Sequence, residues 1–149
     1  MITHIDATNY RCFENLSIAT GQFAVVAGAN GSGKTTLLDI PVLLGDLLRS
    51  RSISSAFMDP LLNRGPRAST LSELCFRHNG GSFSLGIEAK LPDAQREKVL
   101  QRSIPAVQKD ASKHPTHIRY ELRFRVGEHG LSIQNEYLFL FTHSDDYEA

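Results

Sequence analysis

Apolar and polar positions divide this chain into short strand-like segments, one continuous apolar run and one apolar helix. Residues 2–7 and 16–19 predict two short strands separated by the polar sequence "TNYRCFEN". Residues 23–27, "FAVVA", are typical of a buried strand. Residues 35–48 predict a mostly buried helix, with a kink near Pro41 because proline lacks a backbone donor. We expect four leucines of this helix to lie in the core: Leu37, Leu38, Leu44 and Leu48.

The second half of the chain has loop and hairpin patterns. Residues 49–70 are rich in Ser, Arg, Gly and Pro, which predicts a mobile loop with at most a turn of helix. Residues 71–78 and 82–91 predict a hairpin around a glycine turn, and residues 93–109 are compatible with a helix. Residues 116–126 and 131–141 alternate apolar with charged positions, which predicts an antiparallel hairpin with one wet face. We expect the arginines of the 49–70 loop to be solvated: Arg49, Arg51, Arg64 and Arg67.

Length and composition indicate one soluble domain. A chain of 149 residues without internal repeats is long enough to bury a core of its own. Acidic and basic residues balance at 16 each, so charge does not support DNA binding, although DNA stays a possible partner. Cys12 and Cys75 fit reduced, packed thiols better than a disulfide framework. The start of the chain lacks a signal-peptide pattern, and no apolar run is long enough to span a membrane, so we expect a cytoplasmic protein.

Residues 28–35 carry the most specific chemistry in the chain. They read Gly28-Ala29-Asn30-Gly31-Ser32-Gly33-Lys34-Thr35 and match the phosphate-binding pattern G-x-x-x-x-G-K-[ST] at every fixed position. An apolar run precedes the loop and a helix follows it, so backbone amides and the helix N-terminus would converge on polyphosphate oxygens. Glycines let the backbone curl closely around the anion, Lys34 would reach the β- and γ-phosphates, and Thr35 would ligate magnesium. This pattern predicts binding of ATP with Mg2+.

The order "NYRCFENLSI", a short spacer and then "AGANGSGKTTLLD" resembles the amino-terminal lobe of ABC-type ATPases of the RecF, SMC and OLD-like branch. The resemblance is strongest over residues 1–44. It implies an α/β fold of the P-loop NTPase class, with a mixed sheet, an antiparallel β-lobe and a helix after the Walker A loop at residues 28–35. It also implies a homodimer formed around ATP that drives an effector protein or nuclease, in DNA repair or anti-phage defence.

The same resemblance implies roles for particular residues. Lys34, Thr35 and Thr36 would bind the phosphates and magnesium, Asn30 would face the γ-phosphate, and Arg11 and Phe13 would flank the nucleotide. The complete set of expected cofactor-binding residues is Arg11, Phe13, Asn30, Gly31, Ser32, Gly33, Lys34, Thr35 and Thr36. Tyr10 could stack on adenine in place of Phe13, and the sequence leaves both open.

The chain departs from the family pattern where hydrolysis is concerned. The family uses a Walker B strand of four apolar residues followed by Asp-Glu, and this sequence has none. In "YLFLFTHSDD", three residues separate the apolar strand from Asp145 and Asp146, so a carboxylate there would overshoot the metal. The "LSGG"-type signature is absent too. We therefore interpret residues 1–149 as the amino-terminal part of a longer ATP-binding domain, inactive as a hydrolase on its own and without an assigned catalytic residue.

Two other functions stay open at this point. The missing acidic strand is compatible with a non-hydrolysing nucleotide sensor or interaction module. A small-molecule kinase would use the same loop, but it would continue with alternating parallel strands and helices, whereas residues 71–141 read as hairpins. His114 and His117 do not predict a metal site, because Pro115 prevents a helix between them and no thiol or acidic cluster is near in sequence.

Overall fold

A single antiparallel sheet organises the molecule. The computed structural model describes residues 1–50, 52–60, 65–79 and 81–142. The strands are β1 (Ile2–Tyr10), β2 (Phe13–Ala19), β3 (Ser82–Lys90), β4 (His117–Gly127) and β5 (Gly130–Phe141). Their order in the sheet is β2-β1-β3-β4-β5, and every pairing in it is antiparallel. The expected α/β class and antiparallel β-lobe are confirmed, whereas a mixed sheet is not found in the described residues.

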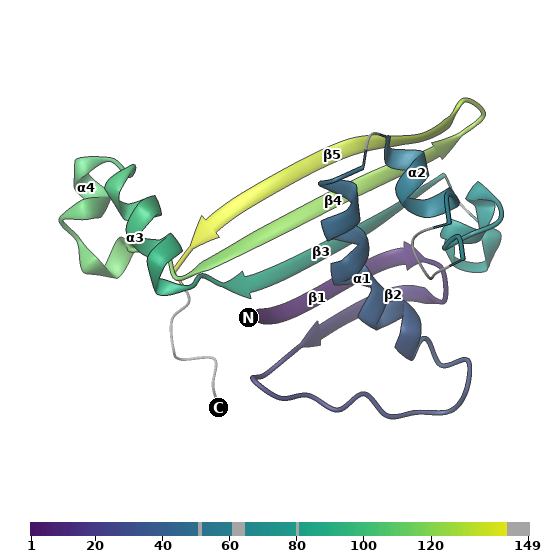
Figure 1. Cartoon of the computed structure of the whole chain (residues 1–149), viewed down its shortest axis with the longest axis horizontal. Coiled ribbons are helices and arrows are strands. Elements are labelled where there is room, and N and C mark those ends of the chain that lie inside the picture. Colours follow the sequence, from purple (N-terminus) through teal and green to yellow (C-terminus); the bar gives the residue numbers. More distant parts are fainter. Residues whose placement is uncertain (51, 61–64, 80, 143–149) are drawn as a thin grey trace.

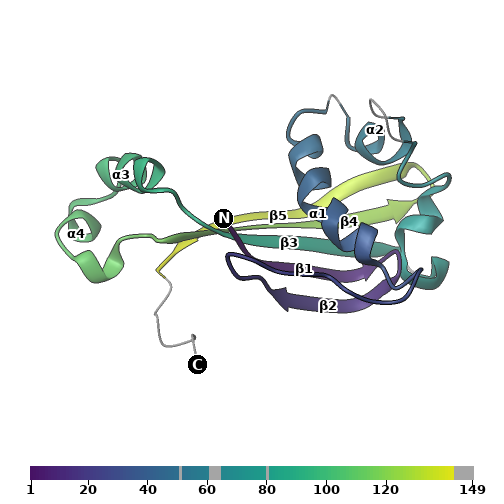
Figure 2. The ribbon, with the colours of Figure 1, turned by 60° about the horizontal axis from the view of Figure 1, so that its bottom comes forward.

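The helices lie on one face of the sheet and beyond one end of it. They are α1 (Lys34–Leu47), α2 (Ile53–Met58), α3 (Asp93–Gln101) and α4 (Pro105–Gln108). Short 3-10 turns span Leu71–Leu74, Phe76–His78 and Ala111–Lys113. Figure 1 shows α1 and α2 across the sheet, and α3 and α4 beyond the other end of the strands. In the turned view of Figure 2, α1 and α2 stand on one side of the sheet.

The core forms where α1 and α2 meet the sheet. Phe83 and Phe124 stack on neighbouring strands with ring centroids 4.8 Å apart. Phe57 of α2 meets both rings edge-on, at 5.9 and 5.5 Å. Aromatic pairs prefer these offset and edge-to-face arrangements because the ring face is negative and the edge positive. These three rings therefore pack α2 against β3 and β4.

The buried face of α1 is only partly the predicted one. Leu37, Ile40, Leu43 and Leu44 are buried, whereas Leu38 and Leu48 are 61% and 73% exposed. Placing all four predicted leucines in the core was wrong: at about 100° per residue Leu38 points outside the face shared by the buried residues, and Leu48 lies just beyond the last residue of the helix.

The apolar run 23–27 does not form a strand. Phe23 is 87% exposed and Val25 is 75% exposed, and the segment has no strand pairing in the structure. A strand needs a neighbour for its backbone N–H and C=O groups, and no described strand pairs with residues 23–27. The predicted buried strand is therefore wrong for these residues.

Residues 49–79 also differ from the expectation. The segment 71–78 is not a strand but two 3-10 turns, because β3 already has β1 on one side and β4 on the other. Arg67 is not solvated: its side chain is 6% exposed and contacts Asp39 and Asp46. Arg49 is exposed as expected. Two other arginines of the predicted loop, Arg51 and Arg64, lie outside the described residues. Gly80 of the predicted glycine turn lies outside them too.

The carboxyl-terminal half follows its sequence pattern more closely. The predicted closing hairpin is confirmed as β4 and β5, which remain paired up to Gly127 and Gly130. The predicted helix over 93–109 forms as two helices, and the second begins at Pro105. Proline has no backbone N–H to donate, and its fixed φ suits the first helical position, so Pro105 starts α4.

Candidate functional site

The loop at residues 28–33 leads directly into α1. Gly33 is the residue before the helix and has a φ of 92°, and Gly31 has a φ of 81°. Both angles lie in the left-handed region that glycine adopts without steric cost. No side chain caps the first turn of α1, and no acidic residue lies in that turn. Its amides and the positive end of the helix dipole are therefore available to an anion.

Gly33 also fixes the loop against the turn between β1 and β2. A Cβ atom at this position would lie 2.7 Å from Cys12 Sγ and 2.9 Å from the Phe13 ring. Such distances are too short for real Cβ contacts. The sheet turn and the loop are therefore in close packing contact, which only glycine permits here.

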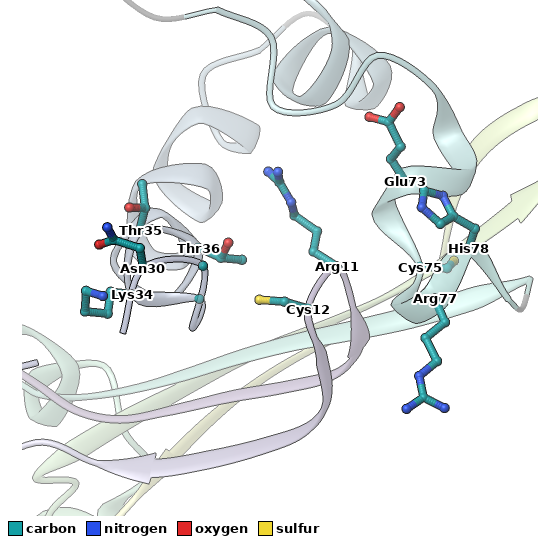
Figure 3. A pocket seen from close by; sticks show the side chains of 12 residues that line it. Arg11, Cys12, Asn30, Lys34, Thr35, Thr36, Glu73, Cys75, Arg77 and His78 are labelled. Atoms are coloured by element: carbon teal, nitrogen blue, oxygen red, sulfur yellow. The ribbon is translucent and has the colours of Figure 1, made fainter. Parts of the chain in front are cut away.

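A cavity of about 520 Å³ opens between the loop and residues 73–78. Figure 3 shows Asn30, Lys34 and Thr35 on one side of it and residues 73–78 on the other, with Arg11 and Cys12 between them. The volume lies within the range of about 300–1,000 Å³ usual for small-molecule sites. The lining residues are Arg11, Cys12, Asn30, Gly31, Gly33, Lys34, Thr35, Thr36, Glu73, Cys75, Arg77 and His78.

Lys34 is held by the loop that it follows. Its Nζ donates hydrogen bonds to the carbonyl oxygens of Gly28 and Ala29, at 2.7 and 2.6 Å. The ammonium group is therefore drawn back across the loop. Phosphate oxygens would compete with these two neutral carbonyls, and charge-assisted hydrogen bonds to an anion are about twice as strong as neutral ones.

Arg11 is positioned by the backbone of the β1–β2 turn. It adopts a φ of 51°, and its N–H donates to the carbonyl of Leu74 at 2.9 Å. A left-handed residue other than glycine costs about 1–3 kcal/mol and persists only where the surroundings impose it. The bond to Leu74 ties this turn to the opposite wall of the cavity.

Most of the predicted nucleotide-binding residues meet in this cavity. Seven of the nine line it: Arg11, Asn30, Gly31, Gly33, Lys34, Thr35 and Thr36. Ser32 lies within the loop, where its N–H donates to the Ala29 carbonyl at 3.2 Å. Phe13 packs beside Gly33, as the glycine contacts show, and is not among the lining residues.

The alternative in which Tyr10 stacks on adenine is wrong for this structure. Tyr10 is 1% exposed, and its ring packs against Phe83 with centroids 5.2 Å apart. Burial raises the pKa of its hydroxyl to about 12. The side chain is a core residue without a surface for a base.

Sequence reasoning missed the opposite wall of the cavity: Glu73, Cys75, Arg77 and His78. Glu73 accepts a hydrogen bond from the Ser69 N–H at 2.8 Å, which is the main cause that lowers the pKa of its carboxyl group. Burial raises the pKa of the Cys75 thiol. Cys12 is exposed, contrary to the expectation of a packed thiol, and both thiols are free. No local pattern indicates this wall, because residues 71–78 read as a strand.

The acidic pair near the end of the sequence and the histidines at 114 and 117 were not expected to carry chemistry. Asp145 and Asp146 lie outside the described residues. His117 is buried against Phe141, with ring centroids 5.6 Å apart. Within the ranges that the structure describes, no group of three or more His, Cys, Asp or Glu side chains could hold a metal ion. No helix of those ranges is long and apolar enough to cross a bilayer.

The fold and the cavity thus define an α/β protein in which a G-x-x-x-x-G-K-T loop and an arginine-bearing sheet turn line one cavity. The OLD nuclease of Thermus scotoductus is 36% identical to this chain over 63 residues, which are 40% of this chain and 12% of the relative. The predicted resemblance to the OLD-like branch is confirmed over that stretch, although the chain covers only a small part of the relative's length.

Two further comparisons complete the picture. A solved structure from work on ATP-driven dimerization and DNA-stimulated activation of SMC ATPases has a TM-score of 0.41 and 19% identity to this chain. That likeness covers 93% of this chain and 68% of the other. No family model matches the chain.

Proposed function

We propose that this chain is the ATP-binding lobe of a Mg2+-dependent ATPase. The observation that carries the proposal is the meeting of the 28–33 loop, the uncapped start of α1 and Arg11 in one cavity. The arrangement fits a polyphosphate because no side chain competes for the first amides of α1. The loop can pack this closely on the β1–β2 turn only because Gly33 has no Cβ.

The residues divide into roles by their chemistry. Backbone amides of the loop and the first turn of α1 would hold phosphate oxygens, and Lys34 would add a positive charge. The Thr35 hydroxyl would ligate Mg2+, which neutralises phosphate charge when it is bound. Arg11, already placed at the cavity, would balance the charge of the nucleotide.

In the full-length protein, we propose, this lobe joins further segments and dimerises around ATP. The exposed apolar residues of 23–27 support a longer domain, since a parallel strand from other residues would cover them. The similarity to the OLD nuclease of Thermus scotoductus supports a nuclease as effector, in anti-phage defence or DNA repair. A net charge of zero does not favour DNA as a partner.

Titration of the chain with Mg-ATP by calorimetry tests the binding function. Lys34→Ala removes the cation held at the loop, and we expect affinity to fall at least tenfold, about 1.4 kcal/mol. Lys98→Ala removes an exposed lysine from α3 and should bind as the wild type does. Equal affinity of the Lys34→Ala variant and the wild type would contradict the assignment.

A phosphate-release assay tests the division between binding and hydrolysis. The described residues hold no Walker B carboxylate beside the loop, and the Glu73 carboxylate lies on the opposite wall of the cavity and accepts from the Ser69 N–H, so we expect this chain alone to match the Lys34→Ala background. A longer protein that includes Walker B and signature segments should show activity that rises with concentration as dimers form. Turnover by the short chain that is lost on changing Asp145 or Asp146 would refute this part.

A further inference from the structure

The cavity extends from the phosphate-binding loop to the 71–78 segment. No part of the nucleotide has yet been assigned to the end that the 71–78 segment lines. Neither aromatic residue that could have met the base is there: Tyr10 is buried in the core and Phe13 lies beside Gly33. The residues that do line the far end are polar and come from the 71–78 segment. These residues are therefore the candidates for contact with a nucleoside.

The 71–78 segment is held to its surroundings by several backbone contacts. Cys75 forms an isolated antiparallel bridge with Tyr10, and the Leu74 carbonyl accepts from the Arg11 N–H. The Glu73 carboxylate accepts from the Ser69 N–H at its start. These contacts join the wall to the same turn that packs under the loop, so both sides of the cavity have a common support in the sheet.

Arg77 and His78 hold strained backbone conformations at this wall. Their φ angles are 52° and 56°, in the left-handed region that non-glycine residues seldom adopt. Each such residue costs about 1–3 kcal/mol, and such strain clusters where a ligand is clamped. Two consecutive strained residues at the edge of a cavity therefore point to a ligand contact at this wall.

The two side chains suit a nucleoside. The Arg77 guanidinium carbon lies 5.0 Å from the centroid of the Phe76 ring, which keeps the planar group oriented. Guanidinium planes and imidazole rings stack on nucleic-acid bases, and both donate hydrogen bonds. Neither side chain contributes to an ion pair found among the described residues.

We propose that Arg77 and His78 form the nucleoside half of the site, stacking against the base of a nucleoside triphosphate whose phosphates lie at Lys34 and Thr35. This inference rests on the proposed ATP binding and adds the residues that distinguish a nucleotide from a bare polyphosphate. The wall then contributes specificity, and the loop contributes the attraction for phosphate.

Comparing Mg-ATP with inorganic tripolyphosphate by calorimetry tests the proposal. The variants are Arg77→Asn and His78→Asn, singly and together, because asparagine tolerates the left-handed region and preserves the wall. We expect the double variant to lose at least tenfold in affinity for ATP and to keep wild-type affinity for tripolyphosphate. Arg102→Asn, at the end of α3, is the matched control and should change neither affinity.

The outcomes separate this inference from the proposed function. Lys34→Ala should weaken both ligands, because it acts on the phosphates. Wild-type protein that binds neither ligand would overturn the proposed function and this inference with it. Wild-type protein that binds ATP, with a double variant that binds ATP equally well or loses both ligands equally, would overturn the nucleoside wall alone. Far-UV circular dichroism of each variant confirms that it is folded.

Discussion

Replacing Arg67 with alanine should lower the free energy of unfolding by about 3 kcal/mol. Its guanidinium donates to Asp39 at 2.7 and 3.1 Å, to Asp46 at 2.6 Å and to the Ala56 carbonyl at 2.6 Å. These bonds tie α1 to α2 and to the segment that follows α2. Burial lowers the pKa of Arg67, but the hydrogen bonds and charges of Asp39 and Asp46 outweigh it and raise the pKa above its ordinary value.

The magnitude follows from what the substitution leaves behind. Removing one partner of a buried ion pair costs about 3–5 kcal/mol, because the remaining charge is uncompensated. The Arg67 side chain is 6% exposed, but the side chains of Asp39 and Asp46 are 17% and 21% exposed and can regain some water. We therefore take the lower end of that range. For a chain of this size, about 3 kcal/mol corresponds to a Tm lower by roughly 6–12 °C.

Urea unfolding followed by far-UV circular dichroism measures this change. Arg123→Ala is the matched control, because Arg123 is exposed on β4 and its loss should change stability by no more than about 0.5 kcal/mol. A loss for Arg67→Ala that is no larger than the loss for Arg123→Ala would refute the reasoning. It would show that the two aspartates are hydrated well enough to need no partner.

Three further predictions concern glycine and charge. Gly33→Ala should abolish ATP binding, because the new Cβ would meet Cys12 Sγ at 2.7 Å and the φ of 92° disfavours alanine; calorimetry measures this. Gly45→Ala, inside α1 with open space around it, should raise stability in urea unfolding by about 0.5–1 kcal/mol. Asp6→Asn should cost stability at neutral pH, and that cost should disappear in unfolding measured as the pH falls below about 4.

The sign of the pH effect follows from the environment of Asp6. Burial raises the pKa of Asp6. Hydrogen bonds from Ser17 and Arg119 and the charge of Arg119 lower it by more, so its pKa is below the usual 3.8. A carboxyl group with a lowered folded pKa stabilises the fold above its unfolded pKa and loses this contribution as the pH falls through the folded value. A stability difference between wild type and Asp6→Asn that persists unchanged in acid would contradict this account.

The two glycine predictions check each other. If Gly33→Ala still binds ATP normally, the packing of the loop on the β1–β2 turn is not needed for the site. If Gly45→Ala lowers stability, α1 is not free to accept a side chain on that face. Together, the two substitutions separate a steric requirement at the loop from a general preference for alanine in a helix.

The sequence alone determined the features that depend on local order. The residues from Gly28 to Thr35 specify a loop before a helix, because glycine spacing, Lys34 and Thr35 are needed at adjacent positions. The hairpin of β4 and β5 follows from alternation, since side chains of successive strand residues point to opposite faces. The position of Arg11 beside the loop also followed from the sequence, through its resemblance to the family.

Tertiary structure alone decided which segments found partners. The apolar run 23–27 looks like a strand in sequence, but a strand exists only when another strand accepts its hydrogen bonds. Arg67 looks like a solvated loop arginine until two aspartates from α1, 21 and 28 residues away in sequence, surround it. Arg77 and His78 reach the cavity only because β1 and the 71–78 segment meet through Tyr10 and Cys75. Each outcome depends on contacts between distant residues, and local periodicity carries no record of such contacts.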